Sequence, residues 1–261
     1  VFDFTESRGR DGPAEFLHDF HGHVTVDAYG VRDGVYLGKE NQIFAACCNS
    51  HARRKFMEAK PNDPVAATRA LALYRGLYDI EDRAKLLSFD ERLELRRGES
   101  APLMNELHAW LIEKRTDPRV LPKSSLCKAV RYTLNQWSEL SVFLDDGAIP
   151  IDNNETESEL RSLTIGRKNW LFVGSSRGGE VAASMYSLVS SAARHNIDVW
   201  AYVDDCLRQL AGGSTDYEVL LPDVWRASHP ESIRVYRDAE KESRRLTTQQ
   251  RRVRRRAARV A

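Results

Sequence analysis

Hydrophobic and polar positions follow two different periods along this chain. Over residues 1–60, short apolar runs alternate with stretches that favour helix, a pattern that predicts an α/β layer with buried strands. Further along, apolar residues recur every three or four positions, as they do on one face of a helix. Strands are expected over residues 1–5, 23–26 and 43–48. Helices are expected over residues 12–20 and after residue 48, where Asn49 or Ser50 is the predicted cap.

Residues 63–144 carry the helical period alone, and Pro64 stands where a first helical residue is expected. The repeating apolar positions are Leu73, Leu77, Ile80, Val130, Leu134, Trp137 and Leu140. This spacing predicts an all-helical block without a strand of ordinary length. Its aromatic residues Trp110, Tyr132 and Trp137 are expected in the core, with Trp137 largely buried.

Mixed structure is expected to resume after this block. The pattern predicts a short extended piece over residues 148–151, a helix over residues 152–161, a polar turn over residues 175–179, a small-residue helix through Val181, Met185, Leu188 and Val189, and a helix that Asp198 caps.

The composition suits one sizeable core, or a core with a helical subdomain, since 42% of the 261 residues are hydrophobic. No apolar run approaches the roughly 20 residues that cross a bilayer, and no signal peptide is expected, so a membrane is not a predicted partner. Four cysteines make no secreted disulfide framework at this length, and a reducing cytoplasm fits them. Because Val1 begins within a strand pattern and no Met precedes it, we expect upstream sequence to be missing.

Cys48 and His51 have the C-x-x-H spacing of a zinc-binding pair. No second Cys/His pair follows at zinc-finger distance, so a structural role for both residues is favoured over zinc.

Residues 151–172 place acids directly before cations. Asp152, Asn153 and Asn154 can cap a helix, which puts Glu157 near its start and Arg161 one turn further on the same face. A basic, aromatic stretch, Gly166-Arg167-Lys168-Asn169-Trp170-Leu171-Phe172, follows. Such a combination is typical of metal-dependent chemistry on a phosphate backbone. A capped surface helix with a solvated acidic turn is the alternative, because acid-rich helix starts are common, and Trp170 is expected in a core rather than stacked on a base.

Four motifs follow one another in a distinctive order. They are Val24-Thr25-Val26-Asp27-Ala28-Tyr29-Gly30, Cys48 with His51-Ala52-Arg53-Arg54-Lys55-Phe56, Leu121-Pro122-Lys123-Ser124, and the segment from Ile151 to Phe172. Together they resemble the transposases of the insertion sequence 66 family. A further likeness at Leu220-Leu221-Pro222 and Trp225 extends the resemblance over nearly the whole chain.

The resemblance implies an α/β fold with a ribonuclease-H-like core of the DDE type, a large all-helical insertion and a helical C-terminal region. In such a core three carboxylates hold two Mg²⁺ or Mn²⁺ ions. By position, Asp27 and Glu157 are the second and third catalytic, metal-binding acids, and the first acid is expected upstream of Val1. The supporting residues are Asp152, Asn153 and Asn154, and the expected DNA-binding residues are Arg161, Arg167, Lys168, Asn169 and Arg177.

Two features depart from the family pattern. The first is that the family's first catalytic acid is expected to be absent, because it lies upstream of the piece that resembles Val1 to Arg8. Asp3 is an acid on an expected strand and could be mistaken for it. However, Phe2-Asp3-Phe4 followed by Ser7-Arg8 aligns better with the next strand of the family. The family usually has Cys-Trp-Ala-His and Glu-Arg, where this chain has Cys48-Asn49-Ser50-His51 and Glu157-Ser158. Losing the arginine beside Glu157 is expected to weaken phosphate contact there, although Arg161 is retained.

The implied organisation has five parts. Residues 1–60 form the first part of the core without its first strand, residues 61–147 the helical insertion, residues 148–212 the second part of the core with the Glu157 helix, residues 213–240 a short C-terminal segment, and residues 241–261 a basic tail. The implied function is metal-dependent cleavage and strand transfer of insertion-sequence ends, by a homo-oligomer on transposon-end and target DNA in the bacterial cytoplasm. One alternative is a truncated, non-catalytic DNA-binding relic. The other is a cellular nuclease of the same fold, which is less favoured because the stretch Arg167-Lys168-Asn169-Trp170 resembles the transposase family.

The tail generates a first prediction. Residues 241–261 hold nine basic residues and one acid, a net charge of +8, which leaves −7 for the rest of a chain whose total is +1. Deleting them should reduce the slope of log DNA affinity against log salt by several units, because arginines displace counterions from phosphates. Divalent-metal binding at Asp27 and Glu157 should not change. If a fluorescence-anisotropy titration gives the truncated chain and the full chain the same affinity and the same slope, the tail is only a solubilising end.

Overall fold

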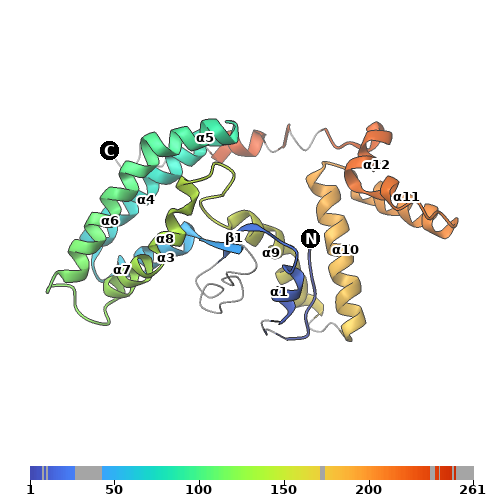
Figure 1. Cartoon of the computed structure of the whole chain (residues 1–261). Coiled ribbons are helices and arrows are strands. Elements are labelled where there is room, and N and C mark those ends of the chain that lie inside the picture. Colours follow the sequence, from blue (N-terminus) through green and yellow to red (C-terminus); the bar gives the residue numbers. More distant parts are fainter. Residues whose placement is uncertain are drawn as a thin grey trace. The chain divides into compact units, whose positions relative to one another are not determined.

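The computed structural model describes residues 1–7, 9, 11–26, 43–170, 174–235, 239–240, 242–248 and 250, without the side chains of residues 167–170. Within this part the chain is mostly helical and has a two-stranded parallel sheet (Figure 1). It divides into two compact units, Ser7–Asn169 and Val1–Glu6 with Trp170–Ala261.

The sheet of the first unit pairs β1 (Gly22–Val26) with β2 (Ile43–Cys47) in parallel, from Gly22 opposite Ile43 to Val26 opposite Cys47. A short helix, α1 (Asp11–Phe16), precedes β1. Four of the five residues of β2 are buried, which agrees with its nearly continuous apolar sequence. Both predicted strands in this region are therefore confirmed, and their carboxyl ends lie at one edge of the sheet.

The strand predicted over residues 1–5 is wrong, because this segment pairs with a helix rather than with another strand. The backbone N–H of Phe2 donates to Ser187 Oγ at 2.7 Å, on helix α10 (Ser176–Arg194). A Cβ atom added to Gly179 of the same helix would lie 2.4 Å from the Phe4 ring, so the absence of a side chain at Gly179 is what admits this ring. The alternation of apolar and polar residues over residues 1–5 does not show that their partner is a helix.

The helical block predicted over residues 63–144 is confirmed, and the described residues contain no strand in that range. Its elements are α4 (Pro64–Ala84), α5 (Phe89–Leu95), the π-helical turn η1 (Arg96–Ser100), α6 (Ala101–Thr116), α7 (Ser125–Asn135), α8 (Trp137–Ser141) and the 3-10 turn η2 (Val142–Leu144). They pack with α3 (Asn49–Ala59) around one core that contains Leu77 and Trp110. Trp137 is only partly buried and lies against His108, with the ring centroids 4.6 Å apart.

A fully buried arginine joins this helical block to the chain that follows it. The guanidinium of Arg96 donates through Nε and Nη2 to the carboxylate of Glu81, at 2.8 and 2.7 Å. Its Nη1 donates to the carbonyl oxygens of Phe143 (2.9 Å), Asp146 (3.0 Å) and Ile149 (2.9 Å). Because three carbonyls converge on one nitrogen, the backbone between them must curve around it.

Gly147 completes this curved segment. A Cβ atom at this position would lie 1.8 Å from the carbonyl oxygen of Phe89, so a side chain there would collide with the start of α5. Arg92 also donates to the Gly147 carbonyl, at 3.3 Å. Residues 148–151 consequently form turns and bends, and the extended piece predicted for them is wrong.

The second unit contains α10, α11 (Val199–Ala211) and α12 (Pro222–Ser228), with the 3-10 turns η3 (Glu218–Leu220) and η4 (Pro230–Ser232). Its small core consists of Ala192, Ile197, Tyr202 and Trp225. Asp198 caps α11 as predicted, since its carboxylate accepts from the backbone N–H groups of Trp200 (2.9 Å) and Ala201 (3.2 Å). Helix α10 begins at Ser176, so most of the polar turn predicted over residues 175–179 is helical.

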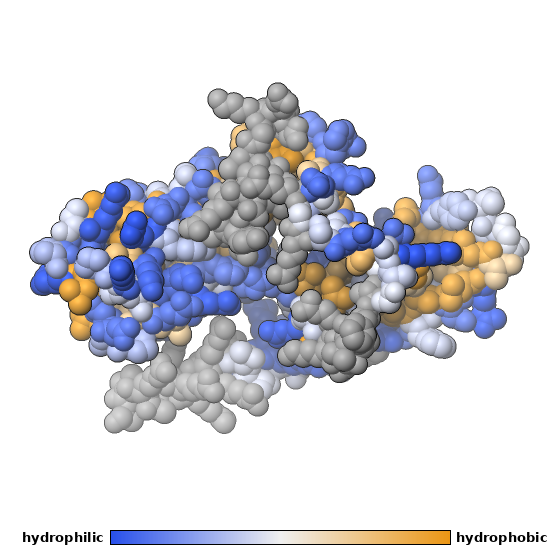
Figure 2. Space-filling model, turned by 90° about the horizontal axis from the view of Figure 1, so that it is seen from below, coloured by the Kyte–Doolittle hydropathy of each residue, from blue (hydrophilic) through white to orange (hydrophobic). Residues whose placement is uncertain are grey.

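Apolar side chains remain uncovered on the helices of this second unit. Val181 and Met185 on α10 are 51% and 46% exposed, and Trp200 on α11 is 81% exposed. Hydrophobic residues gather on this part of the molecule in Figure 2, whereas the surface of the helical block is mostly hydrophilic. Among the described helices, none is long and apolar enough to span a membrane.

We predict that Arg96→Ala lowers the free energy of unfolding by about 3–5 kcal/mol, because it leaves the partly buried Glu81 carboxylate and three carbonyls without their donor. Arg97→Ala is the matched control, since the neighbouring Arg97 side chain is exposed and should change stability by less than about 0.5 kcal/mol. Urea unfolding followed by circular dichroism measures both values. Similar stability in the two variants would show that the buried cluster is not needed for folding.

Candidate functional site

The candidate site lies where both strands end and where helices α3 and α9 (Asn154–Trp170) begin. The backbone N–H of Cys48, directly after β2, donates to Val26 O at 3.2 Å, and the N–H of Asn49 donates to Ile151 O at 3.1 Å. These bonds bring the end of the sheet to the segment that precedes Asp152.

Asn49 has a different role from the helix cap predicted for it. Cys48 occupies the N-cap position of α3 and makes no side-chain cap bond there. The Asn49 side chain is buried, and its Nδ2 donates to Leu140 O (2.9 Å) and Ile151 O (3.3 Å). The amide therefore fixes residue 151 against the start of α3 rather than completing the helix.

Asp152 connects the start of α9 to the helical block. Its Oδ1 accepts from the backbone N–H of Asn154 at 3.1 Å, and its Oδ2 accepts from the hydroxyl of Tyr78, on α4, at 2.7 Å. Burial and then the hydrogen bond to Asp152 raise the pKa of Tyr78 well above its ordinary value, so the hydroxyl stays protonated and donates. The guanidinium of Arg53 lies 5.9 Å from the centre of the same tyrosine ring.

Cys48 is buried beside this junction. Burial raises the pKa of its thiol, more than the nearby backbone N–H groups of Asn153, His51 and Ser50 lower it. Cys48 is only 2% exposed, which suits a core position and the structural role favoured from the sequence.

Glu157 lies in the first turn of α9, where the helix dipole favours a carboxylate. Its side chain is 41% exposed, and its Oε1 lies 3.5 Å from Nε2 of His51, beyond ordinary hydrogen-bond length. Nδ1 of His51 is buried and has no hydrogen-bond partner within the described part of the chain. Arg161 is exposed one turn along α9, and within the described residues Glu157 pairs with His51 instead.

Most of the other predicted site residues lie wholly or partly outside the described residues. Asp27 follows the last residue of β1 and lies outside the described residues. Arg167, Lys168 and Asn169 belong to α9, which extends well beyond the end predicted at Arg161, but their side chains are also outside the described part. Arg177 is exposed in the first turn of α10, in the other unit.

Two oxygen donors near the start of α9 are of the kind that a hard divalent cation binds. Glu157 offers carboxylate oxygens to solvent, and the buried Oδ1 of Asn153 has no partner among the described groups. Oxygen donors of this kind suit Mg²⁺ or Mn²⁺ better than zinc. Within the described residues, which do not include Asp27, no three His, Cys, Asp or Glu side chains gather to hold a metal.

Sequence reasoning missed two residues of this junction. Tyr78 has no motif around it, and the helical period marks only its neighbour Leu77 as a core position. The two carbonyl contacts of Asn49 depend on long-range packing, so a preference for helix caps pointed to the wrong partner. His51 was singled out by its spacing from Cys48, which gave no hint of the approach to Glu157.

Comparison with known proteins identifies the relatives of this chain. The family model described as Transposase IS66 family matches residues 1–181. The uncharacterized protein y4jD of Sinorhizobium fredii (strain NBRC 101917 / NGR234) is 36% identical over 232 residues, which are 86% of this chain and 45% of that protein. The uncharacterized protein y4hP of the same strain is 31% identical over 252 residues, 89% of this chain and 45% of that protein. The chain thus spans about half the length of the curated relatives it matches. No solved structure matches it.

We predict that Tyr78→Phe lowers the free energy of unfolding by about 1–3 kcal/mol, because a partly buried hydroxyl bonded to a carboxylate is lost. Tyr217→Phe removes the hydroxyl of a 66% exposed tyrosine and should cost less than about 0.5 kcal/mol. Chemical denaturation of the two variants and the unmodified chain tests this difference. Equal values for both variants would mean that the bond to Asp152 contributes nothing to the junction.

Proposed function

We propose a DNA transposase function for this chain, which belongs to the transposase IS66 family. In this proposal the chain is the C-terminal catalytic portion of a DDE-type enzyme that cleaves insertion-sequence ends and transfers their strands to target DNA. The observation that carries it is the position of Glu157, an open carboxylate at a helix start beside the carboxyl ends of two parallel strands. Family membership supports the proposed reaction class, and the open carboxylate of Glu157 at the junction supports its proposed location.

The proposed fold is a ribonuclease-H-like core interrupted by the helical block. The two parallel strands, followed by α3, would belong to the first part of this core over residues 1–60, and α9 would open the second part over residues 148–212. The block between them corresponds to the insertion over residues 61–147. Residues 213–240 and the basic tail over residues 241–261 would complete the five parts.

Asp27 and Glu157 are the proposed metal-binding acids. Asp27 directly follows Val26 in the sequence, and the Val26 carbonyl accepts from the backbone N–H of Cys48 at the junction. A third acid is proposed from sequence upstream of Val1. When bound, a pair of Mg²⁺ or Mn²⁺ ions would activate a water or a 3′-hydroxyl and stabilise the leaving oxygen.

The protein's own groups have separate proposed roles. Asp152, Asn153 and Asn154 hold the start of α9, which orients Glu157. Cations along α9 and at the start of α10 are proposed to contact DNA phosphates; they are Arg161, Arg167, Lys168 and Arg177, with Asn169 as a neutral donor. Assembly as a homo-oligomer on DNA is part of the same proposal.

Glu157→Gln tests the proposed role of the carboxylate. Mn²⁺ affinity should fall. Strand transfer of an oligonucleotide with a free 3′-hydroxyl into plasmid DNA should drop by more than about 100-fold, because losing a residue that only supports a metal ligand already costs up to about 100-fold. Glu155→Gln is the matched control, because it removes the same charge from an exposed position two residues earlier, on another face of α9.

The outcomes separate an enzyme from a relic. If both glutamate variants retain equal metal affinity and transfer activity, Glu157 is not a catalytic ligand. If the unmodified chain binds DNA but shows neither metal binding nor transfer, the non-catalytic relic is the better description. The reading frame upstream of the Val1 codon gives an independent answer, because an open frame that encodes a further strand with an aspartate favours the enzyme and a stop codon favours the relic.

A further inference from the structure

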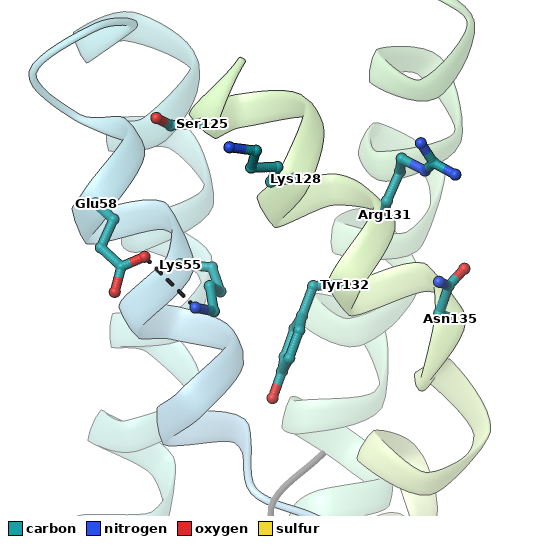
Figure 3. A pocket seen from close by; sticks show the side chains of 7 residues that line it. All are labelled: Lys55, Glu58, Ser125, Lys128, Arg131, Tyr132 and Asn135. Atoms are coloured by element: carbon teal, nitrogen blue, oxygen red, sulfur yellow. Dashed lines mark ion pairs between the residues drawn. The ribbon is translucent and has the colours of Figure 1, made fainter. Parts of the chain in front are cut away.

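A basic groove lies between helices α3 and α7, apart from the junction described above. Its hollow has a volume of about 450 Å³ and is lined by Lys55, Glu58, Ser125, Lys128, Arg131, Tyr132 and Asn135. Figure 3 shows Lys128 projecting from α7 on the side of Ser125, and Lys55 and Tyr132 between the two helices. The lining contains three cations and a single acid.

The charges of this groove are only partly neutralised. Glu58 forms an ion pair with Lys55 at 3.5 Å, and the ammonium of Lys55 also lies 5.8 Å from the centre of the Tyr132 ring. Lys128 and Arg131 are exposed and have no acidic partner within the described part of the chain. Two free cations therefore remain in a hollow that offers further polar groups from Ser125 and Asn135, a combination suited to anionic oxygens.

The walls of the groove are held in place by the core. On α3, Ala52, Phe56 and Ala59 are completely buried, and on α7, Leu126, Ala129 and Val130 are nearly so. These residues belong to one hydrophobic cluster, so the two helices cannot separate without exposing it. On α7, Lys128, Arg131 and Asn135 follow one another at helical spacing and share a face. The cations are thus presented by a preformed surface.

One face of α3 leads from the candidate site to the groove. His51, which approaches Glu157, stands four residues before Lys55 and seven before Glu58, so these residues share one face of the helix. Seven residues of helix span about 10 Å. At about 3.4 Å per nucleotide step, that length corresponds to roughly three steps of a DNA strand. A strand with a phosphate near Glu157 can therefore reach the groove within a few nucleotides.

We propose that the groove between α3 and α7 binds the DNA backbone, with Lys128 and Arg131 contacting phosphates a few nucleotides from the one held near Glu157. This inference rests on the proposed function, since it takes DNA as the ligand, but it assigns DNA contact to the helical block rather than to α9 or the tail. The site reads no bases. It fixes the direction in which the strand leaves the candidate site.

The test compares two double variants of the full 261-residue chain that lose the same charge. Lys128→Ala with Arg131→Ala removes the free cations of the groove. Arg97→Ala with Arg115→Ala removes two exposed arginines without an acidic partner among the described residues, one on η1 and one on α6. Circular dichroism and urea unfolding establish that both variants fold. Fluorescence anisotropy then follows binding of a labelled DNA duplex across a salt series.

The groove variant should bind DNA more weakly, and its slope of log affinity against log salt should decrease by about 1.8, since each phosphate contact contributes about 0.9. The control variant should keep the slope of the unmodified chain. If both variants match the unmodified chain while all three bind DNA, the groove inference is overturned and the proposed function stands. If the unmodified chain binds no DNA at any salt concentration, both fail.

Lysine acetylation read by mass spectrometry identifies the surface directly. Duplex DNA should protect Lys128 and leave Lys85 reactive, because the Lys85 side chain is 70% exposed on another part of the same unit. Inorganic phosphate at the same phosphate concentration should protect neither. Equal protection of Lys128 by inorganic phosphate would mean a simple anion site, and protection of Lys85 as strong as that of Lys128 would mean non-specific coverage. Either result would overturn the inference.

Discussion

The buried guanidinium of Arg96 is the interaction on which the arrangement of the first unit depends. It pairs with Glu81 on α4 and draws three carbonyls of residues 143–149 around one nitrogen, so it connects the helical block to the segment that leads to Asp152. A lysine could not do the same, because only the planar guanidinium offers five donors in fixed directions. Gly147 then lets this segment approach the start of α5 closely. The position of Glu157 consequently depends on residues outside α9, among them Arg96 and Gly147.

The sequence predicted most of the elements because their signals are local. Helical spacing over residues 63–144, the Pro64 start and the Asp198 cap depend only on neighbouring residues, and the two described strands are short apolar runs. The predictions that are wrong concern segments whose partners are distant in the sequence. The strand expected over residues 1–5 instead contacts α10, and the extended piece over residues 148–151 is curved by Arg96. No periodicity within either segment contains that information.

The same distinction applies to the candidate site. The start of α9 and the place of Glu157 in its first turn could be predicted, because caps and acidic first turns have a sequence signature. Tyr78 could not, since its hydroxyl meets Asp152 from a helix 74 residues earlier in the chain. The Asn49 amide likewise acts on carbonyls 91 and 102 residues away. Two of these three contacts reach Ile151 and Asp152, and the third reaches Leu140 in the helical block. The helical block therefore both separates and positions the two halves of the proposed core.

The charge distribution gives this arrangement a further consequence. Residues 1–240 carry a net charge of −7 and the tail +8, so the body as a whole repels DNA at long range while the tail attracts it. At physiological ionic strength such repulsion is screened beyond about 8 Å, and contacts at closer range are set by individual side chains. Unpaired cations on an acidic body therefore matter more than their number suggests. Under the proposed function, Lys128 and Arg131 lie on α7 beside α3, the helix that begins at the candidate site, and would decide where a phosphate backbone contacts this unit.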